Sequence, residues 1–60
     1  MYTKYAKLRK KKKLTDADVA KQSGVTPSTF SDWKAGRSKP KVEKLVKIAK
    51  VLECRLEDLI

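Results

Sequence analysis

Apolar residues recur along the chain at spacings of three and four, which place side chains on one face of a helix. This pattern predicts five helical segments and no strand, so the expected fold class is all-α. The segments cover residues 3–12, 16–23, 27–35, 42–52 and 56–60. The fourth segment has the clearest apolar stripe, which consists of Val42, Leu45, Ile48, Ala49 and Leu52.

The first and last segments carry shorter apolar stripes. Tyr2, Tyr5 and Leu8 recur every three residues and are expected to face the core, whereas the other faces of this segment are basic. The last segment is apolar at Leu56, Leu59 and Ile60. Together the stripes predict one small domain over residues 1–60, near the lower size limit for folding without metals or disulfides.

Residues 16–35 are predicted to form two short helices joined by a tight turn at Gly24. Thr15 and Thr26 each precede a helical segment, as residues that cap a helix do, and Pro27 suits a first helical position. Both starts have hydrophobic-staple spacing, in the pairs Leu14 with Val19 and Val25 with Phe30. This arrangement is a helix-turn-helix, whose second helix usually enters the DNA major groove.

The charge of the chain agrees with an anionic partner. Lysines and arginines number 16 against 7 acidic residues, which gives a formal net charge of +9. Seven of these cations fall within the first 13 residues. Such a balance favours nucleic acid or an anionic membrane surface, and the helix-turn-helix pattern favours the first.

Several other classes of protein are not expected. The chain has one cysteine and no histidine, so neither a disulfide, a structural zinc site nor another cofactor is predicted. No nucleophile–base pair or phosphate loop indicates an enzyme. No apolar run approaches the roughly 20 residues of a membrane span, and no signal peptide is evident, so a cytoplasmic protein is expected. Cys54 is expected to be a buried structural thiol, with redox sensing as the alternative.

A set of residues spread over nearly the whole chain matches one family pattern without a gap. They are Leu8, Leu14, Thr15, Val19, Ala20, Gly24, Val25, Phe30, Trp33, Gly36, Pro40, Leu45, Ile48, Ala49 and Leu52. With them the chain resembles the Cro/cI-type helix-turn-helix family, also called the xenobiotic response element family. The resemblance implies a five-helix, lambda-repressor-like domain that binds double-stranded DNA as a homodimer and regulates transcription in the bacterial cytosol.

The exposed face of the second helix of this motif contains the candidate base-reading residues. Phe30 and Trp33 lie on one side of that helix when residues are placed at about 100° intervals. The opposite side and its flanks hold Pro27, Ser28, Thr29, Ser31 and Asp32. Asp32 is a candidate acceptor for a cytosine amine, or it is a solvated residue or a brace for Lys34 or Arg37. Because these side chains are short, DNA shape is expected to contribute to specificity.

The candidate phosphate-binding residues flank the same helix. Thr26 lies at its start, Lys34 at its end, and Arg37 and Lys39 in the loop that follows. The resembling domains bind phosphates from these regions. Two alternatives are insertion of Arg37 or Lys39 into the minor groove and an ordinary solvated loop. The basic run at residues 9–13 either contacts a flanking phosphate or forms a free cationic face.

Three residues depart from the family pattern. Asp16 replaces the usual glutamine, and its charge suits a helix N-terminus but repels phosphate. Lys13 occupies a position that is often glycine, so it either takes a positive φ or ends the helix differently. Pro27 replaces a polar base-reading residue and offers only apolar contact, for instance to a thymine methyl group.

The sequence therefore predicts a sequence-specific DNA-binding transcriptional regulator of the phage or mobile-element repressor type. One alternative is an antitoxin-like autoregulator whose partner is a toxin polypeptide. Another is a basic domain that binds RNA, other nucleic acid or membrane without sequence preference. The apolar residues Leu56, Leu59 and Ile60 either form part of a dimer contact or only close the core of the monomer.

Overall fold

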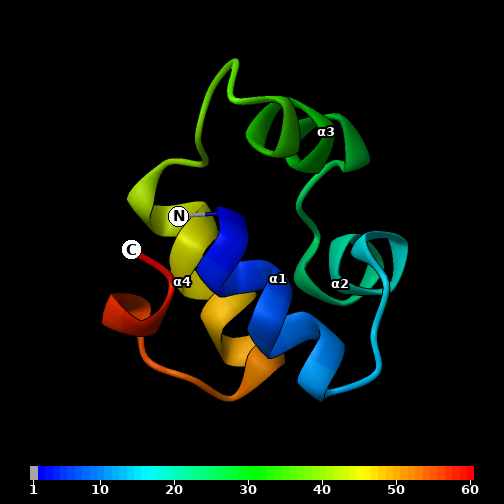
Figure 1. Cartoon of the computed structure of the whole chain (residues 1–60), viewed down its shortest axis with the longest axis vertical. Coiled ribbons are helices and arrows are strands. Elements are labelled where there is room, and N and C mark those ends of the chain that lie inside the picture. The colour runs from blue at the N-terminus through cyan, green and yellow to red at the C-terminus, as the bar shows by residue number, and fades with distance from the viewer. Residues whose placement is uncertain (1) are drawn as a thin grey trace.

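A computed structural model describes residues 2–60, which form four α-helices and one short 3-10 helix (Figure 1). The elements are α1 (Tyr2–Lys11), α2 (Asp16–Ser23), α3 (Pro27–Ala35), α4 (Val42–Leu52) and η1 (Leu56–Asp58). The all-α prediction is confirmed. The bounds of α2, α3 and α4 are as predicted, and α1 begins and ends one residue earlier.

The predicted fifth helix over residues 56–60 is wrong, because the segment forms only the three-residue η1. Its backbone bonds link Asp58 N–H to the Arg55 carbonyl and Leu59 N–H to the Leu56 carbonyl, both of which span three residues. The segment is too short to develop the four-residue bonds of an α-helix. Its main contribution is Leu59, which is fully buried in the core.

One core joins all four helices and the C-terminal segment. Its buried members are Tyr5, Val19, Ala20, Val25, Phe30, Trp33, Leu45, Ile48, Ala49, Leu52 and Leu59. α4 packs against both α2 and η1, and α2 packs against α3. The two ends of the described chain also meet, since Lys4 Nζ donates to the Ile60 main-chain oxygen at 2.7 Å (Figure 1).

Aromatic side chains fasten α1 to α3. The Tyr5 ring stacks on Trp33 with 4.8 Å between centroids and lies 5.5 Å from Phe30. Tyr2 meets the edge of Trp33 at 5.6 Å. The predicted core positions of these aromatic residues are confirmed, with Tyr2 half-buried and the others buried. These aromatic side chains therefore form one packed cluster between α1 and the buried face of α3.

The helix ends follow the local sequence signals closely. The Thr15 hydroxyl accepts the Asp18 N–H at 3.1 Å while the Asp18 carboxylate accepts the Thr15 N–H at 2.9 Å, a capping box. Gly24 ends α2 at a φ of 78°. Lys13, after α1, has a φ of 59°, so the first of its two expected conformations is the one observed.

Thr26 occupies the cap position of α3, but its side chain makes no capping bond. Its hydroxyl instead lies 3.0 Å from the Thr29 hydroxyl and 3.3 Å from the Ser28 hydroxyl. In the first turn of α3, Pro27 has no backbone N–H and the Thr29 N–H donates to the Thr26 carbonyl at 3.1 Å, so few backbone donors remain free there.

Candidate nucleic-acid interface

The first residue of α2 is held by three side chains of α1. The hydroxyls of Tyr2 and Tyr5 donate to the Asp16 carboxylate at 2.9 and 2.6 Å. Arg9 Nε lies 3.0 Å from Asp16 Oδ1, as an ion pair whose angle is unsuitable for a hydrogen bond. Arg9 Nη1 also donates to the Leu14 carbonyl at 3.0 Å. These contacts fix how α2, and α3 with it, is oriented on α1.

This Asp16 cluster, which comprises Tyr2, Tyr5, Arg9 and Asp16, was not predicted from the sequence. The signal was present, because Tyr2, Tyr5 and Arg9 are spaced by three and four residues and share one helix face. The structure explains why aspartate replaces the family's usual glutamine at position 16. A carboxylate can accept hydrogen bonds from two hydroxyls and form an ion pair with a guanidinium group at the same time. The glutamine that the family usually has there lacks the charge for the ion pair.

The two tyrosines act as hydrogen-bond donors to a negative charge. Burial raises the pKa of Tyr5 strongly, and the hydrogen bond to Asp16 raises it further. The pKa of Tyr2 is raised by the same two causes, with burial again the larger. Both hydroxyls therefore remain protonated at neutral pH and hold the Asp16 carboxylate in place.

The candidate base-reading residues lie on α3 where the helix is not covered by the core. Pro27, Ser28 and Ser31 are exposed, whereas Thr29 and Asp32 are half-buried. Thr29 is engaged with Thr26 through their hydroxyls. Pro27, Ser28 and Ser31 are thus the exposed members of the five, and the Ser28 hydroxyl lies 3.3 Å from that of Thr26.

Asp32 braces the loop after α3. Arg37 Nε donates to Asp32 Oδ1 at 3.0 Å, and the Arg37 N–H donates to the Asp32 carbonyl at 2.9 Å. This is the brace to Arg37 that was one expected role of Asp32. The pair is open to solvent, so its contribution to stability is small. Asp32 Oδ2 and the remaining guanidinium N–H groups of Arg37 are left for other partners.

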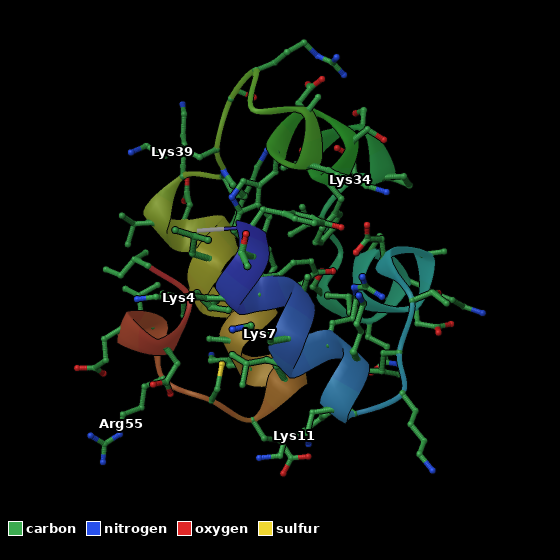
Figure 2. The ribbon with its side chains drawn as sticks, viewed as in Figure 1. Lys4, Lys7, Lys11, Lys34, Lys39 and Arg55 are labelled. Atoms are coloured by element: carbon green, nitrogen blue, oxygen red, sulfur yellow. The ribbon has the colours of Figure 1, made fainter. Side chains whose placement is uncertain are left out.

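The four candidate phosphate-binding residues lie around the same helix. Thr26, Lys34, Arg37 and Lys39 are all exposed. Figure 2 shows Lys34 on α3 and Lys39 on the loop that follows, both at the end of the molecule that α3 occupies. The fold therefore brings a polar helix face and three cations to one surface. We call it the α3 surface, composed of α3 and the loop at residues 36–39.

A shallow hollow lies beside this surface. It is lined by Tyr2, Trp33, Gly36, Ser38 and Lys39. The Trp33 indole N–H is buried and has no hydrogen-bond partner among residues 2–60. The sequence predicted that Trp33 lies in the core. It did not predict the unpaired indole N–H, because burial alone does not show whether a polar atom has a hydrogen-bond partner.

Three observations concern other kinds of site. Across residues 2–60 no helix is long and apolar enough to cross a membrane. The same residues contain no group of three or more potential metal ligands. Cys54 is half-buried, and burial raises the pKa of its thiol, which disfavours the reactive thiolate.

The α2–turn–α3 unit, with its left-handed Gly24 and exposed α3, defines a helix-turn-helix domain. A model of the helix-turn-helix family HTH_3 matches residues 6–59. The chain therefore belongs to this family, the Cro/cI-type helix-turn-helix domains, which are DNA-binding regulatory domains. Neither curated proteins nor solved structures gave a match.

Proposed function

We propose that this protein is a sequence-specific transcriptional regulator of the repressor type that places α3 in the major groove of DNA. The observation that supports this most is the division of α3 into two faces. Phe30 and Trp33 anchor one face in the core, while Ser28 and Ser31 are exposed on the other. A helix mounted in this way presents short polar side chains to base edges. On this proposal residues 1–60 form one DNA-binding domain that acts in the bacterial cytoplasm.

The proposed contacts divide into base-reading and phosphate-binding groups. Base edges meet Pro27, Ser28, Thr29, Ser31 and Asp32, whereas phosphates meet Thr26, Lys34, Arg37 and Lys39. Pro27, Ser28 and Ser31 are the exposed members of the base-reading group. Asp32 retains Oδ2 for a cytosine amine while Oδ1 holds Arg37. Phosphate contacts fix the position of the domain, and base contacts choose the sequence.

We also propose that the protein binds DNA as a homodimer on a two-fold operator. Of the three C-terminal residues expected at the contact, Leu59 is buried and Leu56 packs against the core, so only Ile60 remains available. Ile60 is 53% exposed, and Val42 at the start of α4 is 64% exposed. Both line one largely apolar hollow with Pro40 and Leu45, and Lys39 and Lys41 also line it. The proposed dimer contact is this hollow, with half-sites about one helical turn apart.

Selection of bound sequences from a random duplex library tests the proposed function. We expect enrichment of one motif with two-fold symmetry and a marked preference over unrelated DNA. Tight binding that enriches no motif would instead support the alternative of a basic domain without sequence preference. Enrichment of a single unpaired half-site would contradict the dimer but leave the role of α3 intact.

A further inference from the structure

The solvent-facing side of α1 is a surface of lysines. Lys4, Lys7, Lys10 and Lys11 are all exposed, and α1 contains no acidic residue. At about 100° per residue these lysines fall within an arc of about 120°. We call this surface the α1 lysine face.

The direction of this face is fixed by the Asp16 cluster. Tyr2 and Arg9 point to Asp16 at the start of α2. On the helical wheel these two residues lie roughly opposite Lys7 and Lys11. The α1 lysine face therefore points away from the N-terminus of α2. Figure 2 shows Lys4, Lys7 and Lys11 along α1, whereas Lys34 lies on α3 and Lys39 on the loop that follows α3.

The charges of the α1 lysine face are not neutralised within residues 2–60. The ion pairs there are Arg9 with Asp16, Lys12 with Glu53, and Arg37 with Asp32. None includes a lysine of this face. Lys4 donates a hydrogen bond to the Ile60 main-chain oxygen at 2.7 Å. Glu53 pairs with Lys12, just after α1, at 2.6 Å.

We propose that the α1 lysine face binds the phosphate backbone of a second DNA duplex, so that the protein bridges two DNA segments. The proposal rests on binding of the first duplex by the α3 surface. The described chain measures only 25 × 22 × 19 Å. DNA is stiff over about 150 base pairs, so bending one duplex around so small a domain to reach two surfaces that face different directions is costly.

The same observations disfavour a membrane as the partner. An interfacial helix must insert an apolar face between lipids. The apolar face of α1 is already in use, because Tyr5 is buried in the core and Tyr2 and Leu8 pack against it. A basic face without apolar anchors suits a polyanion, whose binding comes from counterion release and is sensitive to salt.

A bridging assay tests this proposal. One duplex of random sequence is fixed to beads, a second labelled duplex is added with the full chain, and the recovered label is measured. The test variant has Lys4, Lys7, Lys10 and Lys11 replaced by glutamine. The matched control has Lys21, Lys44, Lys47 and Lys50 replaced by glutamine, which removes the same charge from α2 and α4. Thermal melts establish that both variants fold.

We expect the natural chain to recover the labelled duplex and the α1 variant to recover at least tenfold less of it. Binding of the α1 variant to the bead-bound duplex alone should change much less. The control should retain most of the bridging. Equal losses in both variants would overturn the proposal, because net charge would then explain them. Bridging by the α1 variant at the natural level would also overturn it, and would assign bridging to dimers with two α3 surfaces.

These results are separate from those that test the α3 surface. A variant with Lys34 and Lys39 replaced by glutamine should lose binding to the bead-bound duplex itself. If that variant binds and bridges normally, the proposed function of the α3 surface is wrong. If the variant at Lys34 and Lys39 loses binding while the α1 variant bridges like the natural chain, the proposed role of the α1 lysine face is wrong and that of the α3 surface stands.

Discussion

The Tyr5 hydroxyl donates a 2.6 Å hydrogen bond to Asp16 Oδ1, which joins the buried centre of α1 to the first residue of α2. The Tyr5 ring also stacks on Trp33 of α3. One side chain thus contacts both helices of the helix-turn-helix. The orientation of α3 relative to the rest of the domain depends on α1 through these contacts.

Asp16→Ala should lower the free energy of unfolding by about 1–3 kcal/mol, because it leaves two buried or half-buried hydroxyls and Arg9 without their partner. Urea unfolding followed by Trp33 fluorescence measures this effect. Glu57→Ala removes an exposed carboxylate and should change stability by less than about 0.5 kcal/mol. If both substitutions changed the free energy of unfolding equally, the loss of one negative charge would explain both effects. The hydrogen bonds of the Asp16 cluster would then contribute nothing further.

Stability should fall as the pH rises above 10, the ordinary pKa of tyrosine. The raised pKa values of Tyr2 and Tyr5 keep both protonated in the folded state while the unfolded chain loses those protons. The unfolded state then binds fewer protons, so the stabilisation present below pH 10 is lost at up to about 1.4 kcal/mol per pH unit for each tyrosine. Urea midpoints measured from pH 8 to 11 test this, and Tyr5→Phe should give a shallower decline. An identical decline in Tyr5→Phe would exclude Tyr5 as its source.

Lys13→Gly should raise the free energy of unfolding by about 0.5–1 kcal/mol. Lys13 has a φ of 59°, a conformation that glycine adopts without the steric cost of a Cβ. The matched control is Lys7→Gly in the middle of α1, which should lower stability by about 1 kcal/mol. A lower melting temperature for Lys13→Gly would contradict this prediction. It would mean that the left-handed backbone conformation of Lys13 does not destabilise the domain.

Lys39→Ala should weaken binding to every DNA sequence by a similar factor. A lysine that neutralises a phosphate supplies affinity by releasing counterions, so the slope of log affinity against log salt should decrease by about one for each phosphate left without its lysine. Titrations at several salt concentrations, with operator and unrelated duplexes, measure both quantities. Lys21→Ala removes the same charge from α2 and serves as the control. A weakening confined to the operator would mean that Lys39 reads sequence.

Local signals at the helix ends were sufficient for α2 and α3, whereas α4 was predicted from its apolar stripe. Thr15, Pro27, Gly24 and Gly36 act on their own helix ends, so their effect does not depend on the rest of the fold. The last segment lacked such signals. Whether Leu59 or Ile60 enters the core depends on how η1 packs against α4, which apolar character alone does not reveal.

The contacts that hold the α3 surface in place were harder to predict. The Asp16 cluster joins residues of two helices, so it follows from the rotation of α1 against α2 rather than from either segment alone. The pairing of Asp32 with Arg37 was one of several expected roles, and the loop that follows Gly36 determines it. The exposed face of α3 could be derived directly, because Phe30 and Trp33 fix which side is buried.

The most direct test of the proposed function compares the DNA sequence preference of the natural chain with that of Ser28→Ala and Ser31→Ala. Both side chains are exposed on α3, so their removal should leave the fold and the salt dependence nearly unchanged. Competition binding against every single-base variant of the selected operator gives the preference at each position. At least one substitution should reduce discrimination at one position of each half-site by about 1–3 kcal/mol. Unchanged preferences at all positions in both variants would contradict base reading by the exposed face of α3.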